Sequence, residues 1–181
     1  MKSLMEIIKA RKSIRAYKDT PLPQDIVDSI LEAGMNAPTA RNLQQLEYKV
    51  ITNKTLISKL SDGIAKAMQN APNMPPPPPG TPQRPNFFYG APLLVIITAP
   101  KDNPFAVSDG ALAVQNMMLY ATSVDLGSCF IGLAKFIEND PDLLKEINIA
   151  DNMNIVATVI CGYPGEDPEP REKKLTAEYF K

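Results

Sequence analysis

The feature that most constrains the fold is residues 108–124, a segment that is apolar on almost every side when it is read as a helix. Ser108 is its candidate N-cap, and small residues are interspersed among larger ones along it. A helix without a polar face lies in the centre of a domain or in an interface between chains. We expect a homodimer for this reason, and the alternative is a core helix of a single domain. The pattern is carried by Ala111, Leu112, Val114, Gln115, Met117, Met118, Leu119 and Ala121.

The other elements follow from shorter patterns. The continuous apolar, β-branched run at residues 93–98 is typical of a buried strand. Ser3 and Glu6 have capping-box spacing, and Gly34 is a natural C-cap for a second helix. In chain order, we predict helices at 3–10, 26–34, 54–64, 108–124 and 142–147, strands at 46–52, 93–98 and 154–161, and a glycine-flanked turn at 127–132.

Length and charge bound the class of protein. A chain of 181 residues has the usual size of one domain, so we expect a single domain over residues 1–181. Its 19 Lys and Arg side chains balance 20 Asp and Glu side chains, which predicts neither a nucleic-acid partner nor a membrane partner. No signal peptide or long apolar run is evident, so we expect a cytoplasmic protein. Cys129 and Cys161 lack CxxC or metal-ligand spacing, and we expect thiols in the core.

The absence of histidine excludes several mechanisms. Ser-His-Asp and Cys-His nucleophiles, HExxH zinc sites and imidazole general bases all need a residue that this chain lacks. If the protein is an enzyme, we expect a bound cofactor to carry the chemistry and no side chain to act as a dedicated catalytic group. We expect no metal site.

Three cations and a hydroxyl occupy the five residues Arg11–Arg15 and form a candidate anion clamp. Charge-assisted hydrogen bonds from such a cluster could hold a phosphate without covalent attachment. The distant Arg171, Lys173 and Lys174 could converge on the same anion. A solvated basic surface explains the run equally well on composition alone, since Lys9 and Arg11 also complement the end of the preceding helix.

A proline-rich excursion occupies residues 72–86. Eight prolines lie between Pro72 and Pro85, and five of them are consecutive. The run favours a stiff, exposed polyproline II conformation. We expect it to be a surface loop or lid; the alternative is an SH3-type ligand, which is a rarer use of such a stretch inside a compact domain.

Two nucleotide-binding motifs are excluded. Gly127 and Gly132 have phosphate-loop spacing, but Leu133 and Ala134 replace the required Lys-[Ser/Thr] pair. No GxGxxG follows a predicted strand, so a dedicated dinucleotide domain is not expected.

Five segments in order resemble the FMN-dependent nitroreductase family. The first, Arg-Lys-Ser-Ile-Arg-Ala-Tyr, is similar to the family's opening Arg-Arg-Ser-[Ile/Val]-Arg-x-[Phe/Tyr] signature, and the second to its Ala-Pro-Ser-x-x-Asn-x-Gln loop. The later ones resemble the approach to a strand, the central helix with the turn that faces the flavin, and the C-terminal Gly-Tyr-Pro signature. They lie at residues 11–17, 37–44, 89–92, 115–132 and 162–164 with a late arginine.

The resemblance implies an α+β fold with a central mixed, mostly antiparallel sheet flanked by helices, in an intertwined homodimer with two FMN sites at the interface. It implies that Arg11, Lys12 and Ser13 hold the FMN phosphate. Arg171 and Lys173 would close on the same phosphate from the C-terminal segment.

The flavin ring has its own set of implied contacts. Arg15 would lie beside the pyrimidine edge, where a fixed cation stabilises the negative charge of the reduced flavin. The backbone of Ile131 and Gly132 would face flavin N5 and O4. The other subunit would contribute Pro38, Thr39, Ala40 and Asn42.

The implied activity is that of an FMN-dependent NAD(P)H oxidoreductase with ping-pong transfer to a nitroaromatic, quinone or similar acceptor. NAD(P)H would bind transiently. Gln45 and Leu46 stand where the family commonly has Pro-Trp, which leaves the choice of acceptor open. The alternatives are an FMN reservoir or sensor without efficient turnover, and a flavoenzyme reduced by ferredoxin.

Overall fold

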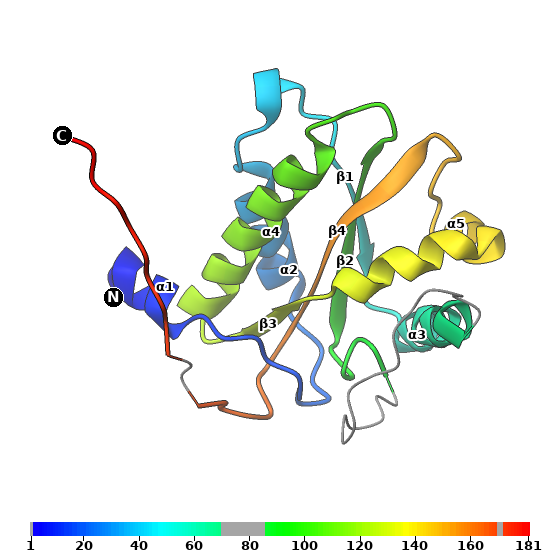
Figure 1. Cartoon of the computed structure of the whole chain (residues 1–181). Helices are drawn as coiled ribbons and strands as arrows, with labels where there is room; N and C mark the ends of the chain where they lie inside the picture. The colour runs from blue at the N-terminus through cyan, green and yellow to red at the C-terminus, as the bar shows by residue number, and fades with distance from the viewer. Residues whose placement is uncertain (1, 70–85, 170–171) are drawn as a thin grey trace.

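A four-stranded sheet with the order β1-β2-β4-β3 forms the centre of the chain, and the pairings between its named strands are all antiparallel (Figure 1). The structure is a computed structural model that describes residues 2–69, 86–169 and 172–181. Most of the predicted proline-rich excursion therefore lies outside the described residues. The strands are β1 (Glu47–Ile51), β2 (Leu93–Pro100), β3 (Gly127–Phe130) and β4 (Met153–Gly162); the helices are α1 (Leu4–Ala10), α2 (Gln24–Met35), α3 (Lys54–Gln69), α4 (Ala106–Ser123) and α5 (Pro141–Glu146), with 3-10 segments η1 (Ala40–Asn42) and η2 (Gly132–Asn139).

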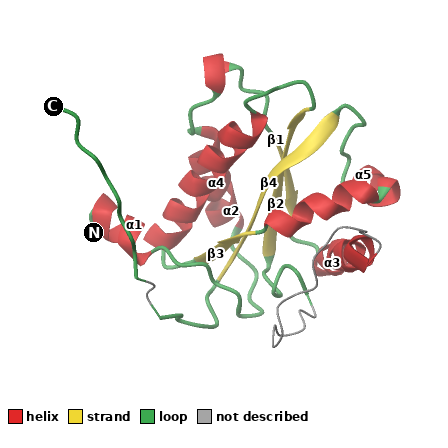
Figure 2. Cartoon of the chain, viewed as in Figure 1, coloured by secondary structure: helices red, strands yellow, loops and turns green. Residues whose placement is uncertain are grey.

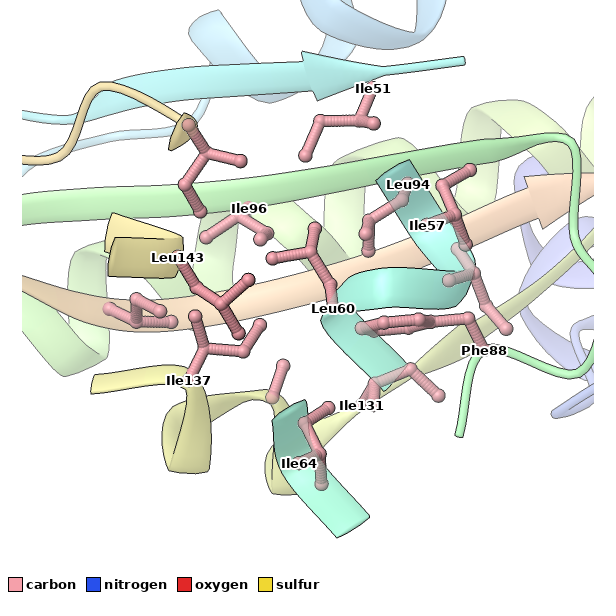
Figure 3. Packing of buried hydrophobic residues seen from close by; sticks show 14 of the residues in the cluster. Ile51, Ile57, Leu60, Ile64, Phe88, Leu94, Ile96, Ile131, Ile137 and Leu143 are labelled. Carbon is pink, nitrogen blue, oxygen red and sulfur yellow. The ribbon is translucent and has the colours of Figure 1, made fainter. Parts of the chain in front are cut away.

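Helices cover both faces of the sheet, with α2 and α4 on one face and α3, η2 and α5 on the other (Figure 2). The position of strand β2 explains why its sequence is apolar without a break: alternate side chains point to opposite faces of the sheet and enter two different cores. Leu94 and Ile96 pack with α3, whereas Leu93, Val95 and Ile97 pack with α2 and α4. Figure 3 shows Leu60 of α3 among Leu94, Ile96 and Phe88.

The long helix predicted at 108–124 is α4, and it begins two residues earlier than predicted. The prediction that Ser108 caps it is wrong: Phe105 occupies the N-cap position without a side-chain hydrogen bond. Asp109 instead places a negative charge in the first turn, where it complements the helix dipole. The apolar sequence of α4 divides between the two sides, since Ala113 and Met117 are fully buried while Val107 and Leu112 are 64% and 46% exposed.

Gly34 was predicted as a C-cap, and this is wrong. Helix α2 continues to Met35 and ends at Asn36. Gly34 is buried, and a Cβ at this position would overlap the side chain of Met117 on α4. The glycine therefore lets α2 and α4 approach closely.

The sheet contains one irregularity, a bulge where the register between β2 and β4 shifts at Ile97 and Thr98. The carboxylate of Glu138 on η2 accepts a hydrogen bond from the backbone N–H of Ile155 at 2.5 Å, so this backbone donor beside the bulge has a partner. On the other face, Gly110 of α4 makes room for Val156, because a Cβ would lie 2.9 Å from its Cγ2.

Helix α1 has the predicted capping box, with Ser3 and Glu6 bonding reciprocally. None of its residues is buried within the chain, and Leu4, Met5 and Ile8 remain exposed. Within the described ranges, no helix is long and apolar enough to cross a membrane. In one chain, apolar side chains of α1 and the side chains of Val107 and Leu112 on α4 are thus exposed to solvent.

Candidate functional site

The Arg11–Arg15 stretch lies extended along the edge strand β3. Ser13 forms a single parallel bridge with Ser128, and the Ile14 N–H donates to the Ser128 carbonyl at 3.0 Å. Ile14 is buried against Gly127, where a Cβ would come within 2.8 Å of Ile14 Cγ1. Because successive side chains of an extended chain point in opposite directions, burying Ile14 turns Ser13 and Arg15 away from the core. Part of the predicted turn at 127–132 is therefore a strand that supports the cations.

The segment after β4 lies along the same stretch. The Gly165 N–H donates to the Ala16 carbonyl at 2.8 Å, and the Arg15 N–H donates to Glu166 Oε1 at 2.5 Å. Asp167 pairs with Lys12 at 2.7 Å. In the described part of the chain, the guanidinium groups of Arg11 and Arg15 form no ion pair. Two cations are therefore available to an anionic ligand, while Lys12 already has a carboxylate partner.

A cavity of about 100 Å³ lies beside Arg15. Ile131 and Gly132 line it, so the structure brings together three of the predicted site residues from segments more than a hundred positions apart. Gly132 is exposed, and a Cβ there would meet no atom closer than 3.9 Å. The remaining lining residues are Phe87, Tyr89, Cys129, Phe130 and Leu133.

Tyr89 reaches this cavity on a strained backbone. Its φ of 55° is left-handed, and Gly90 follows with φ 72°. A hydrogen bond from the Tyr89 N–H to the Asn86 carbonyl at 3.2 Å closes the turn, and Phe88 anchors it in the core with no exposed surface. Strained backbone of this kind persists where surrounding packing enforces it, often at ligand sites.

Tyr17 packs against the core cluster that contains Cys129 and Ile131. Burial raises its pKa, and the neighbouring Cys161 and Cys129 thiols add to the increase. Its hydroxyl donates to the Ile14 carbonyl at 2.8 Å. Tyr17 is thus a neutral structural donor that fixes the turn after the cationic stretch.

The loop that contains Pro38, Thr39, Ala40 and Asn42 lies at the opposite end of α4 (Figure 1). Ala40 bonds to the first turn of α4, whereas Arg11–Arg15 lies beside β3, which follows the last turn. The 18 residues of α4 make a helix about 27 Å long. One chain therefore does not bring this loop to the cationic stretch.

The loop has a defined conformation of its own. Arg41, Asn42 and Gln44 all have left-handed φ values, between 51° and 55°. The Thr39 hydroxyl accepts from the Gln44 N–H at 3.1 Å, and the Gln44 side chain donates to Asn42 Oδ1 at 2.9 Å. The polar side chains of Thr39, Asn42 and Gln44 thus hold the loop in one shape.

The sequence and the fold of the chain are similar to those of known proteins. The sequence model of the Nitroreductase family matches residues 8–163. The chain belongs to the nitroreductase family. The family match confirms the resemblance that the five segments indicated.

Solved structures of other nitroreductases share the fold. A nitroreductase from Bacteroides fragilis, solved with bound FMN, is 29% identical, superposes with a TM-score of 0.86 and covers 100% of this chain and 98% of its own. One from Desulfitobacterium hafniense, also with bound FMN, is 20% identical with a TM-score of 0.85 over 99% of this chain and 100% of its own. A curated relative from Methanothermobacter thermautotrophicus, provisionally named NADH dehydrogenase/NAD(P)H nitroreductase, is 26% identical over 93% of this chain and 81% of its own length. The α+β nitroreductase fold is confirmed.

In this nitroreductase-family chain, phosphate binding by Arg171 and Lys173 stays a prediction. Arg171 lies outside the described residues. Lys173 is exposed in the irregular C-terminal segment, and no hydrogen bond or ion pair among the described residues joins it to Arg11–Arg15.

Sequence reasoning missed several residues around the site. Phe87 was assigned no role in the site, and Tyr89 was noted only within the segment at 89–92 that resembles the family's approach to a strand. Glu166 and Asp167 carried no signal, because two acids in a polar segment are ordinary surface composition. Asp109 is buried at the start of α4 and supports the distant loop, and only its charge within an otherwise apolar helix could have indicated it.

Proposed function

We propose that the chain is an FMN-dependent oxidoreductase that takes electrons from NAD(P)H and passes them, in a ping-pong cycle, to a nitroaromatic, quinone or similar small acceptor. The observation that carries the proposal is the convergence of Arg15 with the backbone of Ile131 and Gly132 around one cavity. Family membership and the FMN-bound relatives support it. Bound FMN would supply the redox chemistry.

The residues present fit FMN. Arg11 and Arg15 are cations without an ion-pair partner in the described part of the chain, and their donors suit a phosphate and an electron-rich ring edge. Gly132 leaves its backbone open to a flat ligand. The cavity of about 100 Å³ beside Arg15 is smaller than the few hundred Å³ typical of a whole ligand site, so it fits one end of the flavin.

Each residue has a distinct proposed role. Arg11, Lys12 and Ser13 hold the phosphate. Arg15 provides positive charge beside the pyrimidine edge, where reduction adds negative charge. The backbone of Ile131 and Gly132 orients the ring at N5 and O4.

The rest of the site comes from a second copy of the chain. The loop of Pro38, Thr39, Ala40 and Asn42 is separated from the cations by the length of α4. A homodimer that covers the exposed apolar sides of α1 and α4 would place the loop of one subunit at the cations of the other. This arrangement also accounts for the exposed Leu4, Met5, Val107 and Leu112.

The test uses purified protein reconstituted with FMN under anaerobic conditions. NADPH and NADH are added separately, loss of flavin absorbance is followed, and a nitroaromatic or a quinone is then added. We expect one nicotinamide to bleach the flavin and the acceptor to restore its colour repeatedly. If neither nicotinamide bleaches it, the proposal is wrong; bleaching by reduced ferredoxin alone identifies a different donor, and bleaching without turnover identifies a reservoir or sensor.

A further inference from the structure

Asp109 stands out because it is a buried charge outside the cavity. Its exposed fraction is 4%, and it is the only charged side chain in the buried class among the residues that the structure describes. A buried carboxylate is retained only where hydrogen bonds and favourable electrostatics stabilise it. The question is what this carboxylate holds in place.

The partner of Asp109 is the loop at the start of α4. Its Oδ1 accepts a hydrogen bond of 3.0 Å from the backbone N–H of Ala40, which lies 69 residues earlier in the sequence. The first turn of α4 provides the second stabilising contribution, since the positive end of the helix dipole favours an anion there. One carboxylate therefore ties η1 to the most central helix of the fold.

The loop requires such a tie. Within residues 41–44, Arg41, Asn42 and Gln44 have left-handed φ values although none of them is glycine. A strained segment persists only where its surroundings over-determine it. Besides Asp109, the start of α4 supplies Phe105, whose ring lies 5.8 Å from the Arg41 guanidinium carbon. The N-cap and first turn of α4 thus contact two adjacent residues of the loop, Ala40 through its backbone N–H and Arg41 through its side chain.

We propose that Asp109 is a positioning residue that fixes the Thr39–Asn42 loop in the shape needed by the flavin site of the other subunit. The inference rests on the proposed function, which places this loop at the partner's FMN. Asp109 itself touches neither flavin nor substrate. Its carboxylate acts through the Ala40 N–H, so its effect is exerted in trans.

The first test compares Asp109→Ala, Asp109→Asn and the control Asp25→Ala. Asp25 also lies in the first turn of a helix but is exposed, so its variant controls for loss of a dipole-facing carboxylate. We expect Asp109→Ala to weaken FMN binding at least about tenfold, because the Ala40 donor loses its partner. Asp109→Asn retains an acceptor oxygen and should restore much of the affinity; Asp25→Ala should match wild type.

Hydrogen exchange of the apo protein provides a readout that does not depend on the flavin. Residues 39–44 should exchange faster in Asp109→Ala than in wild type, with the strands of the sheet unchanged. If Asp109→Ala does not fold, hydrogen exchange is compared between wild type and Asp109→Asn, which keeps the size of the side chain. We then expect a smaller increase in the exchange rate, confined to residues 39–44. Unchanged exchange in the loop, or loss of the dimer by size-exclusion chromatography, overturns the proposal.

Mixed dimers test the trans relationship. One subunit carries Asp109→Ala and the other carries Arg11→Ala with Arg15→Ala, each with its own affinity tag. If Asp109 acts on the partner's flavin, one site combines both intact halves, and the dimer binds one FMN with wild-type affinity. If Asp109 acts within its own subunit, both sites are damaged and no tight site remains, which overturns the inference.

The proposed function fails separately. Wild-type protein that binds no FMN, or FMN that no donor reduces, refutes the flavin assignment. Wild-type protein that binds and uses FMN while Asp109→Ala binds it equally well refutes only the positioning role.

Discussion

Asp167 Oδ1 lies 2.7 Å from the Nζ atom of Lys12, so a carboxylate occupies one of the cations proposed to hold the FMN phosphate. The Asp167 side chain is 90% exposed, and exposed ion pairs contribute at most about 1 kcal/mol. A phosphate dianion can therefore displace it at little cost. Lys12 thus has a weak ion-pair partner within the chain, Asp167, and the FMN phosphate is proposed as its stronger partner.

Replacing this internal competitor should tighten cofactor binding. We expect Asp167→Asn to lower the Kd for FMN about two- to fivefold, which corresponds to the loss of less than 1 kcal/mol of competition. Isothermal titration with FMN measures this. Asp125→Asn is the matched control, because Asp125 forms an exposed ion pair of the same length with Lys2. Weaker FMN binding by Asp167→Asn would show that Asp167 supports the site.

Removing both unpaired guanidinium groups should greatly weaken FMN binding without unfolding the protein. Each charge-assisted hydrogen bond contributes about 1.5–3 kcal/mol, so Arg11→Ala with Arg15→Ala should weaken FMN binding by about two to four orders of magnitude. The purified protein should be folded and largely colourless. Lys18→Ala with Lys101→Ala removes the same charge from exposed positions elsewhere and should stay yellow. FMN retained at wild-type affinity by the arginine variant would remove the cations from the site.

Gly34 should tolerate no side chain without cost. A Cβ there overlaps the end of Met117, and that flexible side chain must move, so Gly34→Ala should lower the free energy of unfolding by about 1–3 kcal/mol. Chemical denaturation gives the value. At Gly132 the nearest atom to a Cβ is 3.9 Å away, so Gly132→Ala should change stability by less than about 0.5 kcal/mol. Equal losses in the two variants would contradict the packing explanation.

Cys161 should make stability fall at alkaline pH. Burial raises the pKa of its thiol from 9.0 to about 12. The unfolded chain loses this proton above about pH 9 while the folded chain keeps it, so the free energy of unfolding decreases with rising pH by up to about 1.4 kcal/mol per unit. Below that window the thiol contributes no pH dependence. Denaturation of wild type and Cys161→Ala between about pH 8 and 11 should show a shallower decline in the variant, and equal slopes would exclude this thiol as a source.

Much of the fold could be predicted because single-chain patterns report burial. The β-branched run at 93–98 marks a strand that feeds two cores, and the Ser3–Glu6 spacing marks the start of α1. Helix boundaries were harder to predict from the sequence where tertiary contacts override local propensity. Ser108 has the right side chain for a cap, yet the helix begins at Ala106, and Asp109 in its first turn accepts a hydrogen bond from Ala40.

The candidate site was only partly predictable for a similar reason. Arg15, Ile131 and Gly132 meet because Ile14 packs on Gly127, a contact that neither short motif encodes alone. Motif order identified the cations and the Pro38–Asn42 loop, but their separation along α4 is a property of the folded chain. Glu166 and Asp167 became relevant only when the segment after β4 was seen to pair with Ala16.

The two-sided apolar character of α4 has a thermodynamic consequence. Val107 and Leu112 add to the exposed apolar surface of α1, and a second copy is proposed to cover it. Unfolding then releases two chains from each dimer, so mass action makes the melting temperature rise with total protein concentration. Dilution alone should destabilise a protein whose sequence, buffer and cofactor are unchanged, and the quantity that fixes its working stability is how much of it the cell makes.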